Sequence, residues 1–232
     1  MTLWLTRIVP DLASRRVRHD LGDIVRMHRR VLSMFPDGLN GEARRKLGVL
    51  FRVENTVSQT VLVQSAVRPD LSGLPYWYGD SATRPLAPLV DALAPGRAVH
   101  YRIAGNAIRR LGPGSPFRAK FGDVMPLGGA EAEQWWARKA AEVGLDLRSV
   151  LTTPLDAALG TKWRRSGGEE KAEQSGRREK KDRPVRHSRT LFEGHAVIAD
   201  AGALRTGLRD GVGRGKAYGC GLLTLAPARG AA

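Results

Sequence analysis

Cysteine is almost absent from this chain: its 232 residues include one, Cys220. A single thiol excludes an intrachain disulfide, and the five histidines are scattered without the spacing typical of a zinc site. We therefore expect neither a metal nor another cofactor. Cys220 lies in a glycine-rich stretch, and we interpret it as a small buried residue of a turn.

Long hydrophobic runs are also missing. No segment reaches the roughly 18 uninterrupted apolar residues of a membrane-spanning helix, and no basic amphipathic helix dominates. The first ten residues are interrupted by Arg7 and lack the apolar core of a secretory signal peptide. We therefore expect a cytoplasmic protein with no membrane partner.

Acidic residues are scarce relative to basic ones. Asp and Glu number 23 against 38 Lys and Arg, which gives a formal net charge of +15. Such an excess favours an anionic polymer, such as a nucleic acid, as the partner. An ordinary solvated surface in an arginine-rich proteome would give the same balance, so charge alone leaves both interpretations open.

Glycine, by contrast, is concentrated in the stretch GVGRGKAYGCGLLTLAP, residues 211–227. Its glycines, together with Arg214 and Lys216, predict a concave anion site for a phosphodiester backbone or a small nucleotide. Asp210 and Ala217 occupy positions that a Walker A loop reserves for Gly and Ser or Thr. Too few residues follow for a dinucleotide-binding βαβ unit. A tight turn leading into a buried final strand is an equally good interpretation.

The first half of the chain has the pattern of a ferredoxin-like unit. Residues 2–9 predict a strand; a basic turn follows, and then apolar residues at helical spacing predict a helix that ends at Pro36. Residues 49–54 and 60–65 predict two paired strands. Strand, helix, strand, strand is most of a ferredoxin-like unit. Prolines make any second helix within residues 66–95 short or irregular.

The second half repeats the pattern with basic insertions. Two insertions interrupt it, a Gly-, Pro- and Arg-rich loop at 106–121 and a charged segment at 162–189; both suit phosphates, although free charged linkers are more often simply solvated. We therefore expect an α+β protein of two tandem ferredoxin-like (RRM-like) domains, 1–95 and 96–232. The elements predicted in this half are strands at 98–104, 191–198 and 222–225 and helices at 131–143 and 199–208.

The glycine-rich stretch resembles the terminal motif of the CasE-type CRISPR repeat endoribonucleases, subunits of type I-E surveillance complexes. The segment LTRIVPDLASRRVRHDLGDIVRMHRRVLSMFP is similar to that family's first strand and helix, and LFRVE and VLVQS to its paired strands. YRIAGN, WWARKA and FEGHAVIAD resemble later segments in the same order. The resemblance implies a metal-independent endoribonuclease that cuts CRISPR precursor RNA at the base of the repeat hairpin and keeps the crRNA. Its implied partners are this RNA and the other subunits of the complex.

The resemblance also implies a catalytic residue. The histidine of the family's first helix corresponds to His28, which would transfer protons while the ribose 2′-hydroxyl attacks the scissile phosphate, leaving a 2′,3′-cyclic phosphate and a 5′-hydroxyl. Without the resemblance, we would interpret His28 as a histidine packed at the edge of the core. Many members carry a tyrosine three residues earlier, where this chain has Val25. A catalytically weak or inactive scaffold subunit that binds the RNA hairpin is therefore the alternative.

Candidate RNA contacts are cations and glycines near these motifs. Tyr218 either stacks on a base or is buried beside the final strand, and His187 has no supporting neighbours in the sequence. The departure of AGNAIRRL from the more basic family version weakens the prediction that Asn106 is a specific contact. The RNA-binding candidates are Arg29, Arg30, Arg109, Arg110, Arg118, Lys120, Gly213, Arg214, Gly215 and Lys216.

Overall fold

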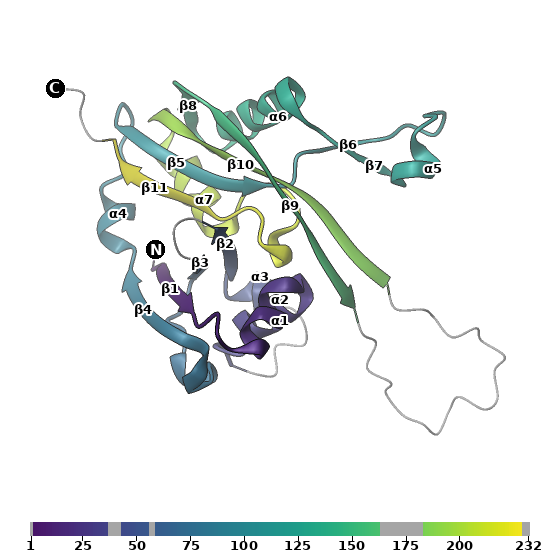
Figure 1. The fold of residues 1–232 in the computed structure, drawn as a ribbon. Helices are drawn as coiled ribbons and strands as arrows, with labels where there is room; N and C mark the ends of the chain where they lie inside the picture. The colour runs from purple at the N-terminus through teal and green to yellow at the C-terminus, as the bar shows by residue number, and fades with distance from the viewer. Residues whose placement is uncertain (1, 37–42, 56–58, 163–182, 229–232) are drawn as a thin grey trace.

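A computed structural model describes residues 2–36, 43–55, 59–162 and 183–228. Two antiparallel sheets form the body of the protein, one from each half of the chain, and a small third sheet projects from the second (Figure 1). The mixed helix and strand content agrees with the predicted α+β class.

The first sheet has the strand order β2-β3-β1-β4, which is the order of a ferredoxin-like unit. Alternation places Thr6 and Ile8 inside and Arg7 outside along its central strand. Strand β4 escaped prediction because nearly all of its residues are exposed, so no hydrophobic alternation marks it. The strands are β1 (Trp4–Pro10), β2 (Leu50–Asn55), β3 (Gln59–Ser65) and β4 (Gly79–Pro85).

Two helices follow the first strand, α1 (Arg15–Gly22) and α2 (Ile24–Leu32), where the sequence predicted a basic turn and one helix. The turn prediction was wrong because α1 shows only Val17 and Leu21, four residues apart, to the core. Asp23 separates the helices and caps α2: its Oδ1 accepts from the backbone N–H of Val25 and Arg26, at 2.8 and 3.0 Å. A short helix α3 (Ala43–Lys46) precedes β2.

The helices between β3 and the second sheet are short, as predicted. They are two 3-10 turns, η1 (Leu71–Gly73) and η2 (Tyr76–Tyr78), and one short helix, α4 (Ala87–Asp91). Val90 on α4 is buried in the core of the second sheet. The domain limit after residue 95 therefore stays a prediction.

The second sheet repeats the order of the first, β8-β10-β5-β11, with β9 paired to the outer part of β10. Both predicted helices are present, α6 (Gly129–Glu142) and α7 (Ala201–Asp210). The strands are β5 (Ala98–Gly105), β8 (Leu145–Leu147), β9 (Leu151–Lys162), β10 (Arg183–Ile198) and β11 (Leu223–Pro227).

Parts of both basic insertions form regular secondary structure where the sequence predicted loops. The expected loop at 106–121 is part of a hairpin of β6 (Ile108–Arg110) and β7 (Val124–Pro126), with α5 (Arg118–Phe121) near its tip, and it projects away from the sheet (Figure 1). Residues 183–189, which the sequence placed in a charged loop, belong to strand β10 and pair there with β9. Residues 163–182 of that loop lie outside the described residues.

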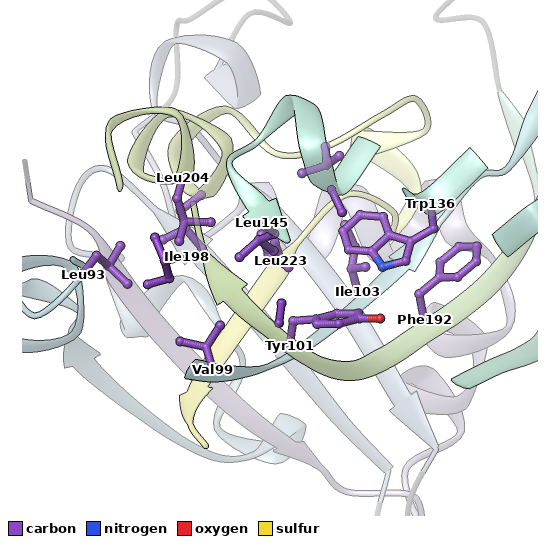
Figure 2. Packing of buried hydrophobic residues seen from close by; sticks show 14 of the residues in the cluster. Leu93, Val99, Tyr101, Ile103, Trp136, Leu145, Phe192, Ile198, Leu204 and Leu223 are labelled. Atoms are coloured by element: carbon purple, nitrogen blue, oxygen red, sulfur yellow. The ribbon is translucent and has the colours of Figure 1, made fainter. Parts of the chain in front are cut away.

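Aromatic rings fill the core of the second unit. Trp136 of α6 stacks on Phe192 of β10 at 5.8 Å between ring centroids and lies 5.4 Å from Tyr101 of β5 (Figure 2). Leu204 of α7 and Leu223 of β11 extend the same cluster. Truncating such a ring typically costs about 3–5 kcal/mol of unfolding free energy. This core therefore stabilises the sheet from which the loops extend.

A buried arginine joins the two units. Arg52 of β2 is 2 % exposed, and its guanidinium donates to the carbonyl oxygens of Arg102 and Leu222, at 2.9 and 2.8 Å. It also donates to the Thr224 hydroxyl and pairs with Glu54. Burial lowers the pKa of Arg52, and Glu54 partly offsets this. The contact fixes the first unit against β5 and β11 of the second.

Candidate nucleic-acid interface

All five glycines of the C-terminal stretch have positive φ. Gly215, at φ +77°, begins the 3-10 turn η4 (Lys216–Tyr218), and its carbonyl accepts from the N–H groups of Tyr218 and Cys220. A Cβ on Gly215 would lie 3.3 Å from the Cβ of Cys220. Cys220 is fully buried, as predicted, and burial raises its pKa to about 12. The stretch is thus a tight turn that leads into a buried strand.

The same turn also has the features of an anion site. Among the described residues, no group accepts a hydrogen bond from the backbone N–H of Gly213, Arg214 or Gly215. Consecutive N–H groups in such conformations form a concave nest that favours an anion. The two interpretations that the sequence left open are therefore compatible, because the turn's own geometry leaves these donors available.

A cleft of about 920 Å³ opens over the glycine-rich stretch. Its walls come from the β6–β7 hairpin, α5, strand β10 and the stretch itself. Of the described residues that line it, four are cations and none is acidic. The walls therefore favour a polyanion. The lining residues used below are Asn106, Lys120, Arg186, His187, Gly213, Arg214, Gly215, Lys216 and Tyr218.

A second hollow of about 410 Å³ adjoins the cleft on the side of α6. The two share Asn106, Gly213 and Arg214, and the second adds the cations Arg110 and Lys139. Arg214 therefore borders both hollows, and a basic surface continues from β10 past the glycine-rich stretch to α6.

His28 lies behind this cleft and does not line it. The residue is half-buried on α2, and its ring sits between two aromatic rings: that of Phe51 at 6.4 Å and that of Tyr218 at 6.2 Å between centroids. Tyr218 lines the cleft, so one aromatic ring separates His28 from it. The prediction that His28 packs at the edge of the core describes its setting, and its neighbour opens onto the basic surface.

His187 is the candidate that sequence reasoning missed. Its ring stacks on Tyr218 at 4.9 Å and an interplanar angle of 20°, and its Nδ1 lies 3.1 Å from the side-chain nitrogen of Asn106. Because an amide nitrogen only donates, Nδ1 accepts in this arrangement, and the proton of the neutral ring is on Nε2. In the sequence, His187 lies among charges without periodicity. Only the path of β10 beside the glycine-rich stretch brings it here.

The other predicted contacts divide between the cleft and the surface away from it. Arg109 pairs with Glu131 at 3.1 Å, and Arg118 pairs with Asp123 at 3.0 Å; neither lines the cleft. Arg29 is exposed on α2, and Arg30 pairs with Asp20 at 2.8 Å; neither lines the cleft. Those that line the larger hollow are Lys120, Gly213, Arg214, Gly215 and Lys216, and Arg110 lines the smaller one.

Comparison with known proteins identifies the family. A family profile described as "CRISPR associated protein" matches residues 3–227. The chain belongs to this CRISPR-associated family. It is 30% identical over 226 residues to the CRISPR-associated endoribonuclease Cse3 of Thermus thermophilus, covering 97% of this chain and 100% of the relative.

Solved structures give the same picture. A structure of CRISPR endoribonuclease Cse3 bound to 19 nt RNA superposes with a TM-score of 0.73 at 28% identity, covering 98% of this chain and all of the other. A chain of a CRISPR RNA-guided surveillance complex matches at 30% identity and a TM-score of 0.59, over 97% and 100% of the two chains. The family relationship and the two sheets confirm the predicted tandem ferredoxin-like fold.

Two further observations concern cofactors and membranes. Among the described residues, no three His, Cys, Asp or Glu side chains come together as metal ligands. Within the same part of the chain, no helix has the length and apolar character needed to cross a membrane.

Proposed function

We propose that this protein is an endoribonuclease that cuts CRISPR precursor RNA at the base of the repeat hairpin, without a metal ion, and retains the crRNA. The observation that carries the proposal is the basic cleft, which has no acidic residue among its described lining and whose Tyr218 contacts the rings of both His28 and His187. A relative that matches over the full chain is named an endoribonuclease, and similar structures hold RNA or belong to a surveillance complex. RNA and the other subunits of such a complex are the proposed partners.

Backbone phosphates are the groups that the cleft would hold. The N–H groups of residues 213–215 offer three donors without a competing acceptor among the described residues. Arg186 and Arg214 add guanidinium groups, which suit phosphate geometry because their donors form a planar fork. These contacts fix the position of the RNA and carry no sequence information themselves.

The proposed chemistry is an internal transfer at phosphorus. The 2′-hydroxyl loses its proton and bonds to the adjacent phosphorus, the bond to the 5′-oxygen breaks, and that oxygen takes up a proton. A 2′,3′-cyclic phosphate and a 5′-hydroxyl result, and no water is consumed. Two proton transfers suit two groups, and His28 and His187 both contact Tyr218. One positioned acid or base typically contributes about 10²- to 10⁴-fold.

A scaffold function is the second candidate, because Val25 stands where many relatives have tyrosine. Val25 is 6 % exposed, and a Cβ built on Gly160 of β9 would lie 2.9 Å from its Cγ2. The ring of Tyr218, a residue near the other end of the chain, lies beside His28. The neighbourhood of His28 therefore still contains a tyrosine. This favours the enzyme over the scaffold.

A cytoplasmic location and the domain limits 1–95 and 96–232 also remain parts of the proposal. The location rests on the substrate, a precursor RNA. The domain limits rest on the separate strand sets of the two sheets, of which the first ends at residue 85 and the second begins at residue 98.

Incubation of the purified protein with an end-labelled repeat hairpin in chelator tests the proposal. We expect one cut at the base of the hairpin, a cyclic phosphate on the upstream product, and the same rate with and without chelator. A single 2′-deoxy nucleotide before the scissile phosphate should abolish cutting and leave binding intact. Tight binding of the all-ribose hairpin without cutting would support the scaffold instead, and absence of binding would contradict both functions.

A further inference from the structure

A second basic surface lies on the first unit, where η2 meets α1 and α2. Tyr76 on η2 is 97 % exposed, more than any other large hydrophobic side chain among the described residues. A ring in this position gains almost nothing from folding, because burial is what stabilises aromatic residues in a fold. Tyr76 therefore presents a free stacking surface.

Two arginine guanidinium groups lie over the neighbouring ring, Trp77. The Cζ of Arg16 lies 5.6 Å from its centroid and the Cζ of Arg30 lies 5.9 Å from it, distances at which cations and aromatic rings attract. Asp20 holds Arg30 at 2.8 Å. These contacts position the side chains of Arg16, Arg30 and Trp77, which lowers the entropy cost of binding a ligand. We call Arg16, Arg30, Tyr76 and Trp77 the N-terminal platform.

The two helices that border the platform are strongly basic, and the acidic residues Asp11 and Asp80 lie near the end of η2. Helix α1 contains one carboxylate, Asp20, and Asp23 lies between the two helices; the first pairs with Arg30 and the second caps α2. Among the described residues, no carboxylate pairs with Arg16 or Arg29. The surface therefore suits an anionic ligand with flat rings, which is the chemistry of unpaired nucleotides. The arginines of the two helices are Arg15, Arg16, Arg18, Arg26, Arg29 and Arg30.

We propose that the N-terminal platform binds the unpaired RNA on the far side of the cut from the hairpin. The inference rests on the function proposed above, with the hairpin in the basic cleft and the cut beside His28. His28 and Arg30 are two residues apart on α2, so they face different sides of the helix. His28 faces Tyr218, which lines the cleft, and Arg30 faces the platform.

The length of RNA between the two sites follows from the width of α2. A helix with its side chains is about 10–12 Å across, and a nucleic-acid strand advances about 3.4 Å per nucleotide. About three nucleotides beyond the scissile phosphate therefore cross the helix, past the exposed Arg29, and the next bases reach Trp77 and Tyr76. This strand is the fragment that leaves after cutting, so the platform aids capture of the precursor without adding affinity for the product.

Two RNAs that cannot be cut test the proposal. One is the hairpin that ends at the cleavage position, and the other carries about six further unpaired nucleotides behind a 2′-deoxy nucleotide, within the site sizes typical of single-strand binding. Wild-type protein should bind the extended RNA about tenfold more tightly than the hairpin, an effect in the range of one stacked base. Tyr76→Ala should lose most of this difference with unchanged affinity for the hairpin, and Tyr76→Phe should retain it.

Each result has a distinct meaning. If wild-type protein does not bind the hairpin, the proposed function fails and this inference fails with it. If the hairpin binds but the extension adds no affinity, or Tyr76→Ala keeps the full difference, the platform proposal alone is overturned. If Tyr76→Ala binds both RNAs normally and loses association with other subunits of the complex, the surface belongs to a protein partner and the proposal is likewise overturned.

Discussion

The two units share one strand order and differ in what is attached to it. The first sheet supports α2, which presents His28. The second sheet carries the β6–β7 hairpin, the outer part of β10 and the glycine-rich stretch, and these line the basic cleft. In the proposed function, one ferredoxin-like plan thus supplies a proton-transfer group from one unit and a phosphate-binding surface from the other.

The junction of the two units and the cleft also differ in whether their charged side chains are buried or exposed. At the junction of the units, Arg52 is buried, and its guanidinium donates to oxygen atoms of the protein. In the cleft, the cations line an open hollow without an acidic residue among the described lining. The buried charge of Arg52 holds the two units together, whereas the exposed cations of the cleft are available to a ligand. Four substitutions test this division of roles.

Replacing His28 with alanine should have the largest effect of the four substitutions, and it should change the cutting rate without changing RNA binding. The cutting rate should fall by about 10²- to 10⁴-fold because one proton-transfer group is lost. Affinity for the hairpin should stay within about twofold, since the phosphate contacts belong to the second unit. Single-turnover kinetics and equilibrium binding measure the two quantities. His19→Ala, at an exposed histidine of α1, is the control; equal losses in His28→Ala and His19→Ala would contradict the assignment.

Replacing Arg52 with methionine should separate the two units. The loss leaves Glu54 and the carbonyl oxygens of Arg102 and Leu222 without their buried donor, which typically costs about 3–5 kcal/mol of unfolding free energy. Chemical denaturation measures this cost. Arg84→Met, at an exposed site on β4 of the same sheet, should change stability by less than about 0.5 kcal/mol. A cost below about 1 kcal/mol in Arg52→Met would show that the units are held together elsewhere.

Replacing Gly215 with valine should affect the second unit alone. Its φ of +77° is left-handed, a conformation that costs a residue with a Cβ about 1–2 kcal/mol. The new Cβ would also approach Cys220 and Asn106. Thermal unfolding should show the loss, and hairpin affinity should fall as the N–H groups of residues 213–215 shift. Gly215→Asn meets the same neighbours but tolerates this φ, so equal behaviour of the two variants would exclude backbone strain as the cause.

Replacing Arg214 with alanine should give the smallest change. If this arginine neutralises one phosphate, the slope of log affinity against log salt should become shallower by about 1. Folding should not change, because the side chain is exposed. Arg209→Ala removes an equal charge that already pairs with Asp210 outside the cleft, and its slope should match that of wild type. A shift in Arg209→Ala as large as in Arg214→Ala would mean that net charge, and not the cleft, governs binding.

Local pattern was a good guide wherever a residue's neighbours in sequence are also its neighbours in space. The spacing of residues 131–143 predicted α6, and Gly144 stands just beyond it with a positive φ. The alternation of residues 98–104 predicted β5. The pattern failed for β4, whose residues are exposed and which is a strand because its backbone pairs with β1 across 75 residues or so of chain.

Some features of the candidate site were likewise evident in the sequence, and others depend on contacts between distant segments. The glycines and cations of residues 211–216 were evident in the sequence, because positive φ and charge belong to the residue itself. His187 and the position of Tyr218 were not, because they depend on which strand crosses which turn. The sequence by itself determined the two sheets, the buried turn and the basic character of the molecule. Tertiary structure alone decided that rings from α2, β10 and the C-terminus meet, since that contact requires two units to pack on each other.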